Sequence, residues 1–352
     1  MTPQYSTDNP ELSPTRKART RLHAKTLLEL GNIERMFSNY TVALAHYQES
    51  QALFHSIQDR NGEALVLNAE GLVYGYLGQY SRALIAFDRA LSGFNSVGNQ
   101  RYCGIVLGNI GNAYHHTGSL ESAIGHYQRA LEIHCDVENR NGEGSVLGVL
   151  GILLHQTGHF HQAMDHFHNA LKIHRAVGNQ PAVGRVLGNL GLVSFDCGKY
   201  EDAAQFHKQS LHIHQTTGAS RSEGIALGNL GESQWKLGLI QAAISNLQRA
   251  IALCDEALPL AAQAFRGTLA IVFAQNDAME EARKLLQDGQ QNLKDQPLEC
   301  AKFLCKSARV YLISGERNTA AAMLNAAREI ANRAQLPLNS PLNRNIENVS
   351  SL

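Results

Sequence analysis

The chain has 352 residues, of which 44% are hydrophobic and only 8 are proline, so it can bury a large core and form long helices. Lys plus Arg and Asp plus Glu are equal at 31 each, and this balance argues against nucleic acid as a partner. The sequence has no apolar run approaching 18 residues and no charged-then-apolar leader. We therefore expect a cytoplasmic protein with no membrane association.

Residues 1–20 contain three prolines, and we expect them to form a flexible N-terminal tail. From residue 21 to 257 the sequence repeats six times with a period of 40 residues. One glycine column reads Gly31, Gly71, Gly111, Gly151, Gly191 and Gly231. An alanine column twelve positions later is unbroken and reads Ala43, Ala83, Ala123, Ala163, Ala203 and Ala243.

Each repeat predicts a pair of helices, which we name helix A and helix B. In the fourth repeat, apolar residues between Val146 and Leu154 form one stripe, as an amphipathic helix A requires. Gly158 is suited to end this helix, because glycine adopts the left-handed conformation without a steric cost. Helix B is expected from about residue 160 to 177, and Asn179 is suited to cap the helix that follows.

Glycines inside helix A, such as Gly188 and Gly191, each cost about 1 kcal/mol relative to alanine in an exposed helix. Their recurrence indicates a compensating gain, which we interpret as close approach of neighbouring helices. Stacked helix pairs of this kind build a solenoid. The predicted fold is therefore all-α: a right-handed superhelical solenoid of antiparallel helix pairs.

Residues 258–335 predict two divergent, capping helix pairs, the first from helices at 258–275 and 278–293. The second pair is expected at 299–314 and 318–334, and Ala282 and Ala320 take the place of the alanine column. Residues 336–352 are expected to form a flexible C-terminal tail.

The repeated glycine, alanine and aromatic positions resemble the tetratricopeptide repeat, of which this chain has a longer, glycine-rich form covering roughly residues 21–335. The segment Glu138-Asn139-Arg140-Asn141-Gly142-Glu143-Gly144 is similar to a subgroup that includes G-protein-signalling-modulator scaffolds, kinesin light chains and bacterial signalling proteins. The resemblance implies a non-enzymatic scaffold or adaptor that binds a partner peptide or domain in a concave groove lined by the A helices.

Three columns of helix A would face this groove. An asparagine side chain carries donors and an acceptor, so a row of them can pair with an extended peptide backbone. The asparagines of related scaffolds act in this way at matching positions, and the alternative is that these side chains only pack between A helices. The predicted groove residues are Asn32, Asn109, Asn112, Arg185, Asn189, Leu192, Asn229, Glu232 and Lys236.

The sixteen histidines recur with the repeat, as at His134, His174 and His214, and we interpret them as solvated helix surface. No spacing typical of a zinc site, phosphate-binding loop or catalytic nucleophile is present, so we expect neither a cofactor nor a metal nor enzymatic activity. A regulatory sensor that responds to a small ligand or metal is the alternative function. Self-association through the terminal helices also stays open.

Overall fold

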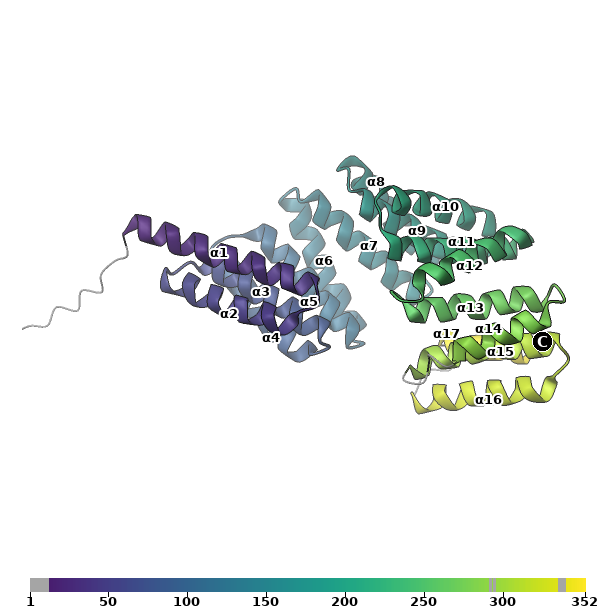
Figure 1. Cartoon of the computed structure of the whole chain (residues 1–352). Helices are drawn as coiled ribbons and strands as arrows, with labels where there is room; N and C mark the ends of the chain where they lie inside the picture. Colours follow the sequence, from purple (N-terminus) through teal and green to yellow (C-terminus); the bar gives the residue numbers. More distant parts are fainter. Residues whose placement is uncertain (1–12, 291–292, 294–295, 335–339) are drawn as a thin grey trace, which may run out of the picture. The chain divides into compact units, whose positions relative to one another are not determined.

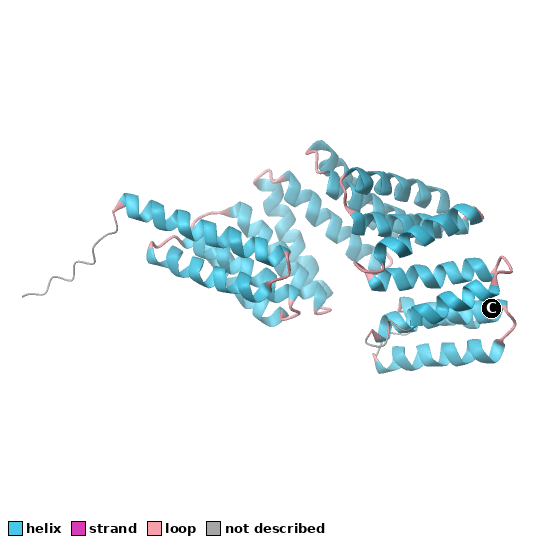
Figure 2. Ribbon diagram, in the orientation of Figure 1, coloured by secondary structure: helices cyan, strands magenta, loops and turns pink. Residues whose placement is uncertain are grey.

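The computed structural model describes residues 13–290, 293, 296–334 and 340–352. Within these residues all regular secondary structure is α-helical (Figure 2). None of the described helices is long and apolar enough to cross a membrane. The chain forms two compact units, residues 1–150 (unit 1) and 151–352 (unit 2), and the boundary falls inside one helix. Each unit is described separately.

Unit 1 consists of successive helices that pack against their neighbours in chain order (Figure 1). Odd-numbered helices up to α15 are A helices, and even-numbered helices up to α16 are B helices. The helices of this unit are α1 (Pro14–Met36), α2 (Tyr40–Ser56), α3 (Arg60–Tyr76), α4 (Tyr80–Ser96), α5 (Gln100–His116), α6 (Leu120–Asp136) and the greater part of α7 (Arg140–Gln156).

Unit 2 continues the same pattern of A and B helices after the last residues of α7. The five helix pairs that lie wholly or partly within it are followed by one further helix. Its helices are α8 (Phe160–Ala176), α9 (Gln180–Asp196), α10 (Tyr200–Thr216), α11 (Ser220–Lys236), α12 (Ile240–Cys254), α13 (Pro259–Ala274), α14 (Met279–Gln290), α15 (Pro297–Ile313), α16 (Arg317–Arg333) and α17 (Pro341–Ser350).

The turns between helices follow the sequence prediction. Gly158 has φ +82° and Gly178 has φ +72°, so both adopt the left-handed conformation that ends a helix. Asn179 caps α9, because its side chain accepts a hydrogen bond from the backbone N–H of Ala182 at 3.2 Å. The two divergent pairs begin and end within about three residues of the predicted positions, except that residues 291–292 of the expected helix 278–293 lie outside the described residues.

A side chain of helix B fills the space beside each glycine of the main glycine column. A Cβ added to Gly111 would lie 2.8 Å from the ring of Tyr127, and one added to Gly151 would lie 2.7 Å from the ring of Phe167. The same holds at the other four positions, where the partners are Tyr47, Phe87, His207 and Leu247. The gain that offsets each glycine is therefore the burial of a large side chain from the paired helix.

Helix A contains a second glycine column, Gly108, Gly148, Gly188 and Gly228, and not all of its members lie against a side chain of another helix. A Cβ added to Gly108 or Gly148 would meet no atom within 4 Å, so no close helix contact explains these two glycines. The prediction of close approach is confirmed at Gly31 and Gly231. There the backbone oxygens of Ala43 and Ala243 lie 3.2 Å from the added Cβ.

Both chain ends differ from the expected tails. Helix α1 begins at Pro14 and not at residue 21, because Ser13 accepts a hydrogen bond from the backbone N–H of Arg16 and starts the helix early. Residues 1–12 and 335–339 lie outside the described residues. Residues 341–350 form α17, whose buried Leu342, Ile346 and Val349 join the core of α15 and α16.

Candidate binding surface on the A helices

Unit 1 contains three of the predicted groove residues. Asn32 lies on α1, and Asn109 and Asn112 lie on α5. The side chain of Asn112 is exposed, whereas Asn32 and Asn109 are half-buried. Each of the three side chain amides forms a hydrogen bond within the protein. These hydrogen bonds decide which amide groups remain available to a ligand.

Two buried tyrosines hold the matching asparagines Asn32 and Asn112. The hydroxyl of Tyr47 donates to Oδ1 of Asn32 at 2.9 Å, and that of Tyr127 donates to Oδ1 of Asn112 at 2.6 Å. Burial raises the pKa of Tyr47 and of Tyr127 above the ordinary value, so both hydroxyls keep the proton that they donate. With its oxygen engaged, Asn112 has its NH2 group left as a donor.

The side chain of Asn109 is held by its NH2 group and not by its oxygen. Its Nδ2 donates to Oδ1 of Asn68 on α3 at 2.9 Å, which leaves its own carbonyl oxygen as an acceptor. Asn68 was not among the predicted groove residues. A signal was present, because Asn68 is the only polar residue in a column that otherwise reads Leu28, Gly108, Gly148, Gly188 and Gly228.

Asn109 and Asn112 line two cavities of unit 1. One, of about 310 Å³, lies between α3 and α5 and is bordered by the aromatic side chains of Tyr76, Tyr80 and Phe87. The other, of about 370 Å³, lies between α5 and α7 and is bordered by Arg101. Asn32 lines neither cavity. The structure thus brings Asn109 and Asn112 together and leaves Asn32 outside their site.

The two cavities differ in chemistry. In the α3–α5 cavity, Tyr80 stacks on His116 with ring centroids 5.4 Å apart, which gives the cavity an aromatic wall. In the α5–α7 cavity, Nη2 of Arg101 lies 3.4 Å from Oδ1 of Asn139. Asn139 is buried and lies 3.1 Å from the ring nitrogen Nδ1 of His134. A ligand that spans both cavities would meet an aromatic wall on one side of Asn109 and a cation on the other.

Unit 2 holds the remaining predicted groove residues. Arg185, Asn189 and Leu192 lie on α9, and Arg185 and Leu192 are exposed. Asn189 is half-buried, as is Asn229 on α11, and no hydrogen bond to either side chain amide is present among the described residues. None of these residues lines the cavity of about 530 Å³ between α9 and α10, which is bordered by Val183, Leu187 and Lys208.

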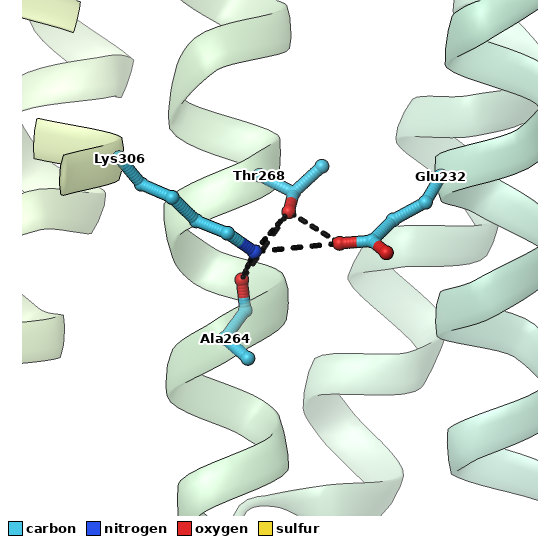
Figure 3. Close-up of polar contacts among 4 residues, drawn as sticks. All are labelled: Glu232, Ala264, Thr268 and Lys306. Atoms are coloured by element: carbon cyan, nitrogen blue, oxygen red, sulfur yellow. Dashed lines mark hydrogen bonds and ion pairs between the residues drawn. The ribbon is translucent and has the colours of Figure 1, made fainter. Parts of the chain in front are cut away.

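Glu232 on α11 joins a polar network within unit 2 (Figure 3). Its Oε1 accepts a hydrogen bond from the hydroxyl of Thr268 at 2.5 Å and lies 3.4 Å from Nζ of Lys306. Nζ of Lys306 also donates to Thr268 Oγ1 at 2.7 Å and to the backbone oxygen of Ala264 at 2.8 Å. One oxygen of the Glu232 carboxylate, Oε1, is thus bound by residues of α13 and α15. This network could not be predicted from the sequence, because Lys306 follows Glu232 by 74 residues.

Lys236 lies one turn after Glu232 on α11 and is exposed. Its Nζ is 4.5 Å from the ring centroid of Trp235, which places the cation over the aromatic face. Although the side chain is exposed as a whole, partial desolvation of its ammonium group, followed by repulsion from Arg309, lowers the pKa of Lys236 below its usual value, and Glu232 opposes this effect.

The prediction that the periodic histidines lie on a solvated surface is wrong for His134, His174 and His214. All three are buried, with exposed fractions of 2%, 1% and 5%. For His134 and His214 the reason is again the glycines: a Cβ added to Gly142 would lie 2.6 Å from the ring of His134, and one added to Gly184 would lie 2.8 Å from the ring of His214. Burial lowers the pKa of His134 and His214, so both rings are neutral at neutral pH.

Among the described residues, no group of three or more His, Cys, Asp or Glu side chains is arranged to hold a metal ion.

Paired antiparallel helices, six of them with a contact between a helix A glycine and a large side chain of helix B, define a helical-hairpin repeat protein. The sequence matches the tetratricopeptide repeat family over residues 22–96, 102–176 and 182–256, which together make up more than half of the chain. The chain belongs to the tetratricopeptide repeat family.

Several solved structures share this fold at low sequence identity. The apo form of RapI has a TM-score of 0.69 and 13% identity, with 91% of this chain and 98% of RapI covered. Aspartyl phosphate phosphatase F from Bacillus subtilis has a TM-score of 0.64 and 15% identity, with coverages of 91% and 94%. The Rap conjugation gene regulator of plasmid pLS20, in complex with the Phr* peptide, has a TM-score of 0.60 and 14% identity, with coverages of 92% and 97%. No curated protein matches the sequence.

Proposed function

We propose that this protein is a non-enzymatic scaffold that binds a peptide segment of a partner protein on the A-helix face of unit 1. One observation carries the proposal: Asn109 and Asn112 lie side by side on α5, and one has a free acceptor while the other has a free donor. The carbonyl oxygen of Asn109 can accept from a peptide N–H, and the NH2 of Asn112 can donate to a peptide carbonyl. The Rap regulator with its Phr* peptide supports the proposal, because its similar fold accommodates a peptide.

The fixed amides favour binding for an entropic reason. Asn68 and Tyr127 already hold the two asparagine side chains in place, so a peptide would not have to order them. The cavities on either side then select side chains. The α3–α5 cavity suits a large apolar or aromatic side chain, and the α5–α7 cavity suits a polar or acidic side chain near Arg101.

The test is selection of peptides from a displayed random library with the intact chain, followed by affinity measurement by fluorescence anisotropy. Asn112→Asp is the informative variant, because its carboxylate still accepts from Tyr127 but no longer offers an NH2 group. We expect its affinity to fall by about tenfold or more, as loss of one hydrogen bond and repulsion of a peptide carbonyl imply.

Asn32→Asp is the matched control. It makes the same change beside Tyr47 but lies outside both cavities, so its affinity should equal that of the wild type. Equal affinities for Asn112→Asp and the wild type would refute the assignment of the site. A library that yields no peptide bound by the intact chain would refute the proposed function.

We also propose that the chain self-associates through the outer face of α1. Leu30 and Ile33 are 41% and 47% exposed there. The residues at the same repeat positions in later A helices, such as Val73 and Ile110, are buried against the preceding B helix. Helix α1 therefore presents apolar side chains that elsewhere in the repeat are covered by another helix.

A second α1 is the occupant that the charges favour. Five basic residues lie in the first half of α1, whereas its acidic residues, Glu29 and Glu34, lie in the second half. Two antiparallel α1 helices would place the basic half of each beside the acidic half of the other. Analytical ultracentrifugation should show a dimer that Leu30→Lys dissociates and that Leu239→Lys, at another exposed leucine, leaves intact. A wild-type monomer at 100 µM would exclude this association.

A further inference from the structure

Two layers of charged side chains lie one helical turn apart on α11 and α15 of unit 2. Glu232 and Lys236 are four residues apart on α11, and Lys306 and Arg309 are three residues apart on α15, so each pair shares one helix face. In the first layer the residues are opposite in charge: Lys306 of α15 reaches across α13 to the carboxylate of Glu232 (Figure 3).

The second layer contains two cations. Nζ of Lys236 is 4.5 Å from the ring centroid of Trp235, and the guanidinium carbon of Arg309 is 5.4 Å from the same centroid. Neither cation has an ion pair with a carboxylate among the described residues. The nearest carboxylate on α11, Glu232, is already bound by Lys306 and Thr268. The second layer therefore has the cations of an ion-pair network without its anion.

A neutral hydrogen-bond donor, the side chain amide of Gln275, lies beside the two cations. The indole N–H of Trp235 donates to Oε1 of Gln275 at 2.8 Å, which fixes the side chain amide and leaves its NH2 as a donor. Gln275 is exposed, directly after the end of α13, and so lies between the helices that carry the two cations. Lysine, arginine and an amide NH2 are the groups that proteins use to hold carboxylates and phosphates.

Electrostatics within the site agree with this geometry. Repulsion from Arg309 contributes, after desolvation, to the lowered pKa of Lys236, so each cation is within the electrostatic reach of the other. An anion between them would oppose this repulsion.

We propose that Trp235, Lys236, Gln275 and Arg309 form an oxyanion-binding site on unit 2, which takes a carboxylate or a phosphate group. The site does not depend on the proposed peptide binding by unit 1, although a carboxylate of a bound partner would be one source of the anion. The other source is a free phosphate-containing molecule.

The chain provides its own reporter, because Trp235 is the only tryptophan. Its fluorescence is measured in the intact chain during titration with sodium phosphate, sodium N-acetylglutamate or sodium chloride at constant ionic strength. We expect a saturable change with at least one of the two oxyanions and none with chloride. The oxyanion that binds more tightly shows whether the natural ligand carries a phosphate or a carboxylate group.

Arg309→Gln and Lys236→Gln should each weaken the oxyanion at least about fivefold, and the double variant should abolish saturation. Lys302→Gln is the matched control, since it removes one cation from α15 that is paired with Glu299 at 2.7 Å. It should bind as the wild type does. The same response to chloride as to the oxyanions, or wild-type binding by Arg309→Gln, would overturn the proposal. Neither result bears on peptide selection by unit 1.

Discussion

His207 should make the stability of unit 2 depend on pH. It occupies the position that holds Phe167 in one repeat and Leu247 in another, and it packs on Gly191 with only 1% of its surface exposed. Its Nδ1 is buried without a hydrogen-bond partner. Burial lowers the pKa of His207 to about 4, and the charge of Glu232 opposes this only in part.

The sign follows from the proton count. The unfolded chain has a histidine pKa of about 6.5, so between about pH 6.5 and 4 it binds a proton that the folded chain does not. The stability that comes from keeping His207 neutral is therefore fully present above pH 6.5 and is lost as the pH falls towards 4. With these two pKa values, the loss between pH 7.5 and 5 is about 2 kcal/mol, and it approaches about 3 kcal/mol below pH 4.

The informative variant is His207→Leu, because Leu247 shows that the repeat accommodates leucine at this position. Urea denaturation followed by circular dichroism at pH 7.5, 6 and 5 measures the effect. We expect the variant to be more stable than the wild type by about 1–3 kcal/mol at pH 7.5, because an unpaired buried nitrogen is removed. The difference should widen by about 2 kcal/mol at pH 5.

His134 and His214 also have a lowered pKa, so the wild type and the variant will both lose stability in acid. Only the difference between the two proteins isolates His207. If His207→Leu and the wild type lose equal stability between pH 7.5 and 5, then the folded chain does not hold this ring in the neutral form, and the reasoning fails.

Two further predictions compare neighbouring positions. Gly111→Ala should lower the free energy of unfolding by about 1–3 kcal/mol through its clash with Tyr127, whereas Gly108→Ala, which meets no atom, should raise it by about 0.5–1 kcal/mol; equal urea midpoints would contradict this. Ile346→Asp should release α17 and increase hydrogen exchange in α15 and α16, because a charge cannot occupy this buried site, while the exposed Arg344→Asp should have no effect. Unchanged exchange in Ile346→Asp would show that α17 does not stabilise these helices.

The regular repeats were predictable because their spacing is constant. The turn glycines recur in most periods and the buried alanines in every one, so a pattern too weak in one repeat becomes clear over six. The alanine column is fully buried throughout, and Ala282 and Ala320 are buried as well, although alanine replaces the helix A glycine in both divergent pairs.

What the sequence could not predict depends on contacts between repeats. The histidines at 134, 174 and 214 looked polar and therefore exposed, but all three are buried, and the rings of His134 and His214 fill space beside glycines. Helix α17 was missed because ten residues with three asparagines favour a tail until α15 and α16 supply an apolar surface. The network of Glu232 and the bond between Asn68 and Asn109 join separate repeats, so periodicity within one repeat cannot reveal them.

The contact between the glycine column and its partner in helix B also sets how this chain can be recombined. Tyr47 and Tyr127 meet Asn32 and Asn112, whereas Phe87 has the apolar Leu72 at the corresponding place in helix A. A whole hairpin could be copied or moved with its pair intact. A crossover between helix A and helix B would instead leave a tyrosine hydroxyl facing leucine, or an asparagine facing a phenyl ring. The segment that can be duplicated or exchanged intact in such a protein is thus the hairpin, so the residues that face a ligand are transferred together with the core residues they contact.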